Sequence, residues 1–301
     1  MARRLVVNAD DAGVDAARDA AMLDAFDRGI VTSASVVANG PMAEAFVKAA
    51  LSRPALGLGL HLNLTEGAPL GGRSFTLAGA AGRFPGDKKA VWKRAVDGHV
   101  DPQEVERETV AQWRRLAQFG ATIDHVDGHN HVHVLPGILD GMLKALEFLK
   151  ASVHVRLPAE EDPPPDAPPV VQPQVPLGTV VLSRHRVRQA QAGHGGIASV
   201  GAHADAARGA IHAPLWSASG FAGLALAVDP GLFLLGASVK SGRGDVLELM
   251  VHPGRSAAST SGFSADVRRA KERDLLCLPA ARDAVAAAGF ELSTFAAARP
   301  Q

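Results

Sequence analysis

The 301-residue chain contains one cysteine, Cys277, and no tyrosine, and only 5% of its residues are aromatic. A single cysteine excludes a disulfide within the chain, and it lacks the partners of a cysteine-based zinc site. Lys and Arg together number 31, as do Asp and Glu, so the formal net charge is zero. This balance gives no sign of a basic surface for nucleic acid. The composition favours a protein of a reducing compartment.

Long apolar runs are also lacking. After Arg3 and Arg4 only Leu5 to Val7 are apolar before Asn8 interrupts the run, which is too short for a signal peptide. No segment reaches the roughly 18 uninterrupted apolar residues of a membrane span. Because 47% of the residues are nevertheless hydrophobic, the chain can bury a large core. We therefore expect a cytoplasmic enzyme-sized protein with no membrane span.

Short β-rich segments alternate with longer segments of helical periodicity. The expected strands are residues 4–9, 32–39, 56–64, 123–128, 153–157, 179–182, 245–251 and 290–295, and the expected helices are residues 15–28, 41–53, 101–120 and 136–150. Repeated β-then-α units predict a parallel sheet, which is either open or closed into a barrel. Acids and histidines follow several expected strands, and barrel enzymes gather catalytic groups at these strand ends. The pattern thus favours an α/β fold of the barrel type.

Residues 158–176 contain eight prolines and cannot form regular structure. This segment is either a linker between domains or a long loop. The βα rhythm resumes after it, so we expect one domain over residues 1–301 with a proline-rich insertion around 158–176.

Carboxylates and imidazoles cluster at the ends of separate expected strands. Adjacent Asp10 and Asp11 suggest a metal that neutralises one carboxylate, although a polar loop that caps the next helix is the alternative. His61 lies in an otherwise apolar strand that ends in a polar turn, where it is either a core residue or a ligand. His252 is placed for proton transfer or for a backbone hydrogen bond at its turn.

Residues 124–133 hold four histidines and two acids. In an extended conformation His129, His131 and His133 would share a face with Asp127. Imidazole is a common ligand of zinc-like ions, and nearby carboxylates can orient it, whereas the alternative is a polar turn rich in histidine. Neither a helical His-Glu-x-x-His motif nor a cysteine site is present, so the ligands must come from distant strands.

In sequence order, four blocks resemble the YdjC-like carbohydrate deacetylases, a family that includes chito-oligosaccharide and hopanoid-associated deacetylases. The blocks are residues 7–13 (VNADDAG), 59–65 (GLHLNLT), 125–133 (HVDGHNHVH) and 251–254 (VHPG). Two departures concern the substrate pocket. Ala12 replaces the usual Phe, and Gly128 and Asn130 stand where chito-oligosaccharide members commonly have Ser and His.

The resemblance implies a distorted (β/α) barrel and one divalent metal ion, Zn or Mg. It implies Asp11, His61 and His129 as metal ligands, Asp10 as general base and His252 as general acid. Arg156 falls where the family carries an arginine near the acid, and a structural salt bridge is its alternative role. Whether His131 or His133 replaces His129 as a ligand stays open.

We therefore expect an enzyme that releases acetate from an N-acetylated sugar, such as the N-acetylglucosamine unit of a chito-oligosaccharide. Another metal-dependent amidohydrolase or phosphoesterase is an alternative, but few Arg or Lys residues flank the blocks to bind phosphate. A non-catalytic sugar-binding protein is a second alternative, and the presence of Asp10 and His252 argues against it. Sugar stacking is limited to Trp92, Trp113, Trp216 and a few Phe residues. The oligomeric state is not set by the sequence, and a homodimer is allowed.

Overall fold

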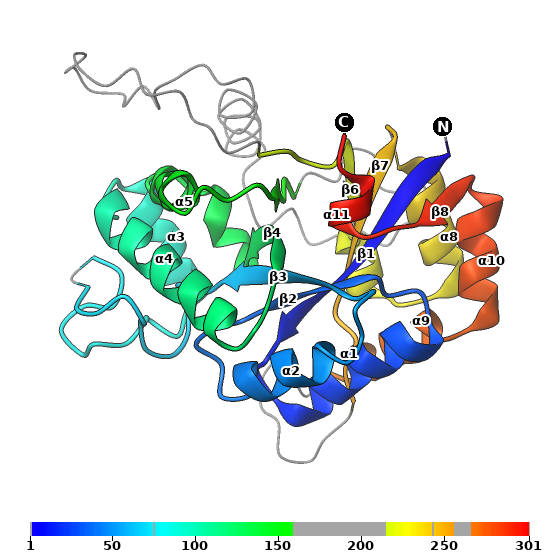
Figure 1. Cartoon of the computed structure of the whole chain (residues 1–301), viewed down its shortest axis with the longest axis horizontal. Coiled ribbons are helices and arrows are strands. Elements are labelled where there is room, and N and C mark those ends of the chain that lie inside the picture. The colour runs from blue at the N-terminus through cyan, green and yellow to red at the C-terminus, as the bar shows by residue number, and fades with distance from the viewer. Residues whose placement is uncertain (1, 75, 159–214, 243, 256–265, 301) are drawn as a thin grey trace.

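The structure is a computed structural model that describes residues 2–74, 76–158, 215–242, 244–255 and 266–300 (Figure 1). The strand expected at 179–182 and all but the first residue of the proline-rich segment at 158–176 lie outside these residues.

The described strands form one parallel sheet. They are β1 (Arg3–Ala12), β2 (Ser33–Val36), β3 (Gly57–Leu62), β4 (Ile123–Gly128), β5 (His154–Val155), β6 (Gly220–Ala222), β7 (Val246–Val251) and β8 (Phe290–Leu292). Their order is β5-β4-β3-β2-β1-β7-β6, and β8 pairs with β1 outside this path. Each pairing among these strands is parallel, so their carboxyl ends gather on one side of the sheet.

The sheet curls until its edges approach each other. A parallel bridge joins His154 of β5 to Trp216, shortly before β6, and the Val155 N–H donates to the Trp216 carbonyl at 2.8 Å. At its start β1 pairs with β8 through Arg3 to Leu5, and only from Asn8 onward does it pair with β2. The predicted α/β class and distorted (β/α) barrel are confirmed.

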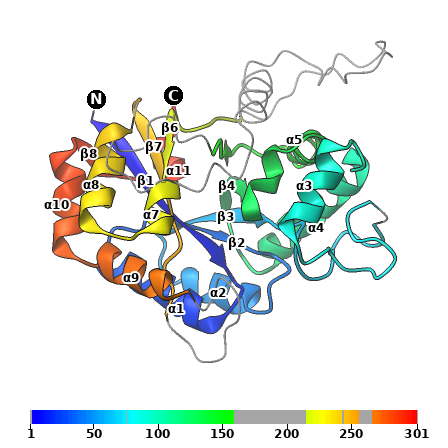
Figure 2. The same cartoon turned by 180° about the vertical axis from the view of Figure 1, so that it is seen from behind.

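Helices surround this sheet on several sides (Figures 1 and 2). They are α1 (Ala16–Arg28), α2 (Ala43–Ala50), α3 (Lys88–Val96), α4 (Pro102–Gln118), α5 (Ile138–Phe148), α7 (Leu224–Val228), α8 (Leu232–Ser241), α9 (Val267–Leu276), α10 (Pro279–Ala287) and α11 (Phe295–Ala298). In both views α3, α4 and α5 lie on one side of the sheet, α8 and α10 lie on the opposite side, and α1, α2 and α9 lie below it.

Helix starts follow the capping residues in the sequence. Asp15 accepts a hydrogen bond from the Arg18 N–H at the start of α1, and Asp101 accepts one from the Gln103 N–H at the start of α4, with Pro102 in its first turn. An acid three residues after the capping residue can bind back to the start of the helix. Glu104 instead accepts hydrogen bonds from Ser74 and Thr76, so it anchors the preceding loop.

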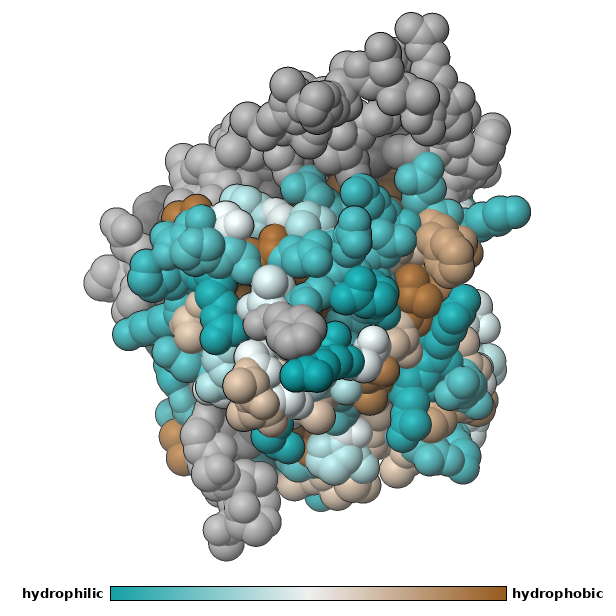
Figure 3. Space-filling view, turned by 90° about the vertical axis from the view of Figure 1, so that its left-hand side faces the viewer, coloured by the Kyte–Doolittle hydropathy of each residue, from teal (hydrophilic) through white to brown (hydrophobic). Residues whose placement is uncertain are grey.

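The buried core is mainly aliphatic and lies between the sheet and its helices. No helix among the described residues has the length and apolar character needed to cross a bilayer. On the face that carries α3, α4 and α5, hydrophilic residues cover most of the area and apolar residues form small separate groups (Figure 3).

Helix α3 and strand β6 were not predicted, because α3 follows a glycine-rich loop and β6 has only three residues.

Candidate active site

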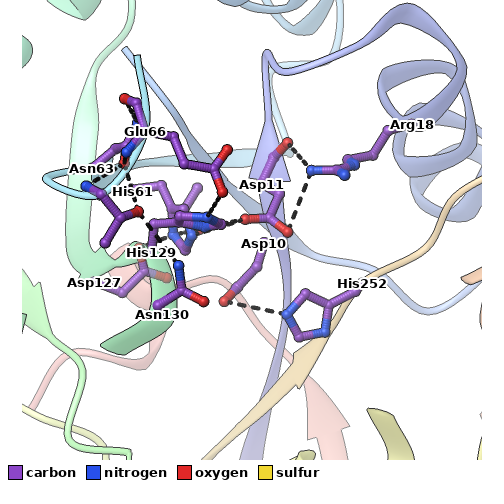
Figure 4. Close-up of polar contacts among 12 residues, drawn as sticks. Asp10, Asp11, Arg18, His61, Asn63, Glu66, Asp127, His129, Asn130 and His252 are labelled. Atoms are coloured by element: carbon purple, nitrogen blue, oxygen red, sulfur yellow. Dashed lines mark hydrogen bonds and ion pairs between the residues drawn. The ribbon is translucent and has the colours of Figure 1, made fainter. Parts of the chain in front are cut away.

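The two adjacent carboxylates lie at a bulge near the end of β1. Between the pairs Ala9–Ala34 and Ala12–Val36, β1 has one residue more than β2. Asp11 also has a φ of 71°, a left-handed conformation that Asp tolerates better than most residues. Neighbouring strand residues normally point to opposite faces, and a bulge relaxes this alternation. As a result, both buried side chains contribute to the same site, as Figure 4 shows.

Asp11 lies against the imidazoles of His61 and His129. Its Oδ1 is 3.2 Å from His61 Nε2 and 2.7 Å from His129 Nδ1. One ligand atom from each residue lies within 4.8 Å of the others, close enough to hold one ion. Strands β1 and β3 and the turn after β4 supply these residues, so the strand ends of the parallel sheet bring them together.

Asp127 orients His61 from behind. His61 Nδ1 is 2.7 Å from Asp127 Oδ1 and 3.1 Å from Ser35 Oγ, which leaves Nε2 facing Asp11. Such carboxylate–histidine pairs fix the tautomer of metal-binding imidazoles. Burial lowers the pKa of His61, but Asp127, Asp11 and Asp10 outweigh burial and raise this pKa to about 10. The site therefore has a strong negative potential at His61.

Asp10 belongs to a different set of contacts, which we call the Arg156 cluster: Asp10, Asp127, Arg156 and Glu248. The two terminal nitrogens of Arg156 donate to the two carboxylate oxygens of Asp10 at 2.6 and 2.7 Å. One of them also lies 2.8 Å from Asp127, and Arg156 Nε donates to Glu248 at 2.6 Å. All four side chains are buried, so one guanidinium balances three carboxylates.

His252 follows β7, on the other side of Asp10 from the imidazoles of β3 and β4. Its Nε2 lies 4.0 Å from Asp10 Oδ2 (Figure 4). Burial and the nearby charge of Arg269 lower the pKa of His252 to about 3, so the ring is neutral at pH 7. A neutral imidazole can act as an acid only after it has received a proton, and Asp10 is positioned to supply one.

The histidine-rich segment is not extended, and the prediction that His129, His131 and His133 share a face is wrong. Residues His129–Val134 form the 3₁₀ segment η1, with left-handed backbone at Asn130 and His131 (φ 56° and 57°). His129 therefore faces Asp11, whereas His133 Nε2 lies 3.1 Å from the Arg156 carbonyl and His131 packs near Phe221.

The turn follows from Gly128. A Cβ at this position would lie 2.8 Å from His133 Cβ, so glycine allows His133 to lie this close to the strand and a larger residue would displace it.

A polar rim borders the imidazoles. Asn63 Oδ1 accepts from the backbone N–H groups of Thr65 and Glu66, and Asn63 Nδ2 donates to the Glu66 carbonyl. The Glu66 carboxylate is largely exposed and lies 3.6 Å from His129 Nε2. Asn130 Nδ2 reaches Thr65 Oγ1 at 3.4 Å. This rim fixes the backbone of Glu66 and leaves its side chain at the solvent-facing side of the site.

The tryptophans named as stacking candidates are used for packing. Trp92 and Trp113 pack against the main core, and Trp216 packs with His154 and Phe295.

Sequence reasoning missed three charged residues of the site. Arg18 and Arg269 both contact Asp11 Oδ2, at 3.4 and 3.0 Å, and Glu248 holds Arg156. The first two lie on helices outside the sequence blocks, so the small number of cations beside the blocks did not reveal them. Glu248 could have been recognised from the sequence, because it is an acid in the middle of the apolar run of β7. Such a residue needs a buried partner.

The chain is similar to known proteins in its sequence and in its fold. The model of the family described as "YdjC-like protein" matches residues 4–287. The mouse protein named "Carbohydrate deacetylase" is 32% identical over 310 residues, which cover 96% of this chain and 93% of the mouse protein. A protein of Yersinia enterocolitica named "Chitooligosaccharide deacetylase" is 39% identical, over 46% of this chain and 53% of its own length.

One solved structure has the same fold over nearly its whole length. It comes from Enterococcus faecalis V583, and its description proposes a role in cellobiose-phosphate cleavage. The TM-score is 0.71 at 19% identity, and the match covers 98% of each chain. At this identity the likeness concerns the fold alone.

Proposed function

Because this chain belongs to the YdjC-like protein family, we propose that it is a metal-dependent hydrolase that removes the acetyl group from an N-acetylated sugar. The relatives named above as carbohydrate and chitooligosaccharide deacetylases support the class of substrate. The observation that carries the proposal is the convergence of Asp11, His61 and His129 beside Asp10 and His252.

The donor set of Asp11, His61 and His129 fits a divalent cation. One carboxylate and two imidazoles are ligands typical of a catalytic zinc site, where a further position stays open. Asp10, His61 and Asp127 form a second group within the same distance of one another. However, Asp10 already accepts hydrogen bonds from Arg156, and Asp127 forms an ion pair with the same guanidinium, so a cation there would have to replace these contacts. We therefore assign the ion to the first group.

When bound, a divalent cation supplies a Lewis acid that polarises a carbonyl oxygen and acidifies water. Asp10 is the base of the proposed reaction and takes a proton from the attacking water. Arg156 donates hydrogen bonds to both carboxylate oxygens of Asp10 and so fixes the direction from which this carboxylate accepts the proton. Arg156 is itself fully buried and acts through Asp10.

The same proton can then reach the leaving group through His252. Its ring is neutral at the start and lies 4.0 Å from Asp10, so it can receive the proton that Asp10 has taken. Protonated His252 is a strong acid because its pKa is low, and it donates the proton to the departing nitrogen. One proton thus travels from water to the amine, the C–N bond breaks, and the products are acetic acid, which then ionises, and the free amino sugar.

A phosphoesterase activity is not favoured by the charges. Arg18, Arg156 and Arg269 all enter the site, but each contacts a carboxylate, and Arg156 contacts three.

Acetate release from N-acetylglucosamine oligomers tests the proposal, with p-nitrophenyl phosphate as the competing substrate. We expect acetate release that a chelator abolishes and that Zn²⁺ or Mg²⁺ restores. Acetate release unaffected by thorough chelation would contradict the metal, and turnover of the phosphate ester alone would contradict the substrate class.

A further inference from the structure

Helix α9 places two charged side chains on its buried face. Arg269 and Glu272 are each 2% exposed, and they continue a buried stripe that includes Leu275 and Leu276. Burial of charge on an apolar stripe costs free energy unless the charged groups have strong partners. The partners of both residues lie at the proposed active site.

Arg269 contacts two separate parts of that site. One terminal nitrogen donates to Asp11 Oδ2 at 3.0 Å, and the other donates to the backbone carbonyl of His252 at 3.3 Å. The Arg269 carbonyl in turn accepts from the Gly254 N–H at 3.0 Å. A Cβ at position 254 would lie 3.0 Å from Arg269 Cβ, so glycine allows the loop and the helix to approach closely. One residue of α9 therefore links β1 to the loop after β7.

Glu272 contacts the backbone N–H of His252, whose carbonyl Arg269 contacts. Its carboxyl group accepts a hydrogen bond from the backbone N–H of His252. Arg269 and Glu272 thus bind the carbonyl and the N–H of His252 respectively, both from one turn of α9. The position of the imidazole relative to β1 depends on this helix as well as on β7.

The two oxygens of Asp11 have different neighbours. Oδ2 faces the guanidinium groups of Arg269 and Arg18, whereas Oδ1 faces the imidazoles of His61 and His129. Guanidinium groups bind carboxylates directionally through a rigid fork of donors. The arginines consequently fix the rotation of the Asp11 carboxylate and turn one oxygen toward the imidazoles.

We propose that Arg269 is a positioning residue that sets the separation between the metal-binding carboxylate of Asp11 and the proton-transferring ring of His252. This inference rests on the proposed function. Arg269 does not reach the reacting atoms in this role. It holds two groups that do, and Glu272 completes the contact on the His252 side.

The test compares R269K and R269M with wild type in two measurements, divalent-metal affinity by calorimetry and steady-state kinetics at saturating metal. Misplacement of reacting groups by about 1 Å lowers turnover by about 100-fold, so we expect kcat of R269M to fall by about this factor with little change in KM. Loss of an outer partner of a ligand weakens metal binding by about tenfold. R269K should recover neither fully, since an ammonium group cannot form both contacts of the guanidinium fork.

Arg273, one turn further along α9, provides the matched control. It contacts Asp24 and Asp274 away from the site, so R273M should keep wild-type kcat and metal affinity. Circular dichroism shows whether each variant folds.

If R269M does not fold, R269K and the pair E272A and E272Q decide the question. E272A should lower kcat, and E272Q should recover most of the loss because its amide oxygen can still accept from the His252 N–H.

Each result has one meaning. Wild-type kcat and metal affinity in R269K would overturn the positioning role, because the charge alone would then suffice. Equal kcat values for E272A and wild type would overturn the contribution of Glu272. If wild type itself neither binds a divalent metal nor releases acetate, the proposed function fails, whatever the variants show.

Discussion

Asp10 and Asp11 are neighbours in the chain, but they belong to two different electrostatic regions. Asp10 lies in the Arg156 cluster, where one guanidinium contacts three carboxylates. Asp11 lies in what we call the Asp11 cluster, formed with Arg18, His61, His129 and Arg269. In the first region carboxylates outnumber the cation, and in the second basic groups outnumber the carboxylate.

This difference shows how one residue type can have two roles. A lone carboxylate that faces two imidazoles with one oxygen can bind a cation through that oxygen. A carboxylate whose two oxygens both accept hydrogen bonds from a buried arginine is fixed in place and suited to accept a proton from a defined direction. The bulge between Ala9 and Ala12 makes this arrangement possible, because it lets both adjacent side chains enter one site, where each meets different partners.

The largest expected effect separates the two aspartates. D10N should retain metal but lose activity by about 1,000-fold or more, since a base contributes roughly 100- to 10,000-fold. D11N should lose metal affinity together with activity. Metal content by atomic emission and acetate release on the same samples measure both. Metal loss in D10N, or unchanged turnover in that variant, would contradict the division of roles.

The next effect concerns the stability of the Arg156 cluster. R156M leaves three carboxylates buried without their cation, and breaking a buried ion pair in this way costs about 3–5 kcal/mol. Urea denaturation without added metal measures this loss. The more exposed pair between Arg53 and Asp27 provides the control, since R53M should cost less than about 1 kcal/mol. Equal losses in the two variants would mean that the cluster is not a major source of stability.

The smallest effect is a pH dependence that comes from Glu248. Burial raises the pKa of Glu248 to about 7 even though Arg156 lowers it, compared with 4.5 for an ordinary Glu. A raised pKa means that the folded state binds the proton more tightly than the unfolded state. The contribution of protonated Glu248 to the free energy of unfolding is therefore complete below pH 4.5 and is lost as the pH rises through about 7.

E248Q should remove this part of the pH dependence. The wild-type free energy of unfolding should fall between pH 5 and pH 8 by an amount on the order of 2–3 kcal/mol more than in E248Q. E291Q, at an exposed pair with Arg4, should follow the wild-type curve. Parallel curves for E248Q and wild type would show that Glu248 does not titrate in this range.

Much of the fold could be predicted because its signals are local. The helix expected at residues 15–28 begins beside the capping Asp15, and the strand expected at 123–128 coincides with β4. The segment after β4 could not be predicted in the same way. Its turn depends on the close approach of His133 to Gly128, a contact that alternation of residue types does not reveal.

The candidate site was predictable to the extent that its residues follow strands. Parallel pairing brings the ends of strands together, and each of these residues lies within two residues of a strand end: Asp10, Asp11, His61, His129 and His252. Their individual roles came from the resemblance to a family and stay proposals. Arg18 and Arg269 were missed because helix periodicity alone does not distinguish a buried arginine from a solvated one. Only the tertiary structure shows that both point at Asp11.

The pairing of β1 has a consequence for the order in which the protein is made. This first strand is bordered by β7 and β8, which are synthesised more than 230 residues later. Contacts so distant in sequence slow folding, because a long loop must close before they form. A ribosome-bound chain that ends before residue 246 would expose β1 along one side and would lack His252. The proposed active site should therefore assemble only after β7, β8 and His252 have been synthesised.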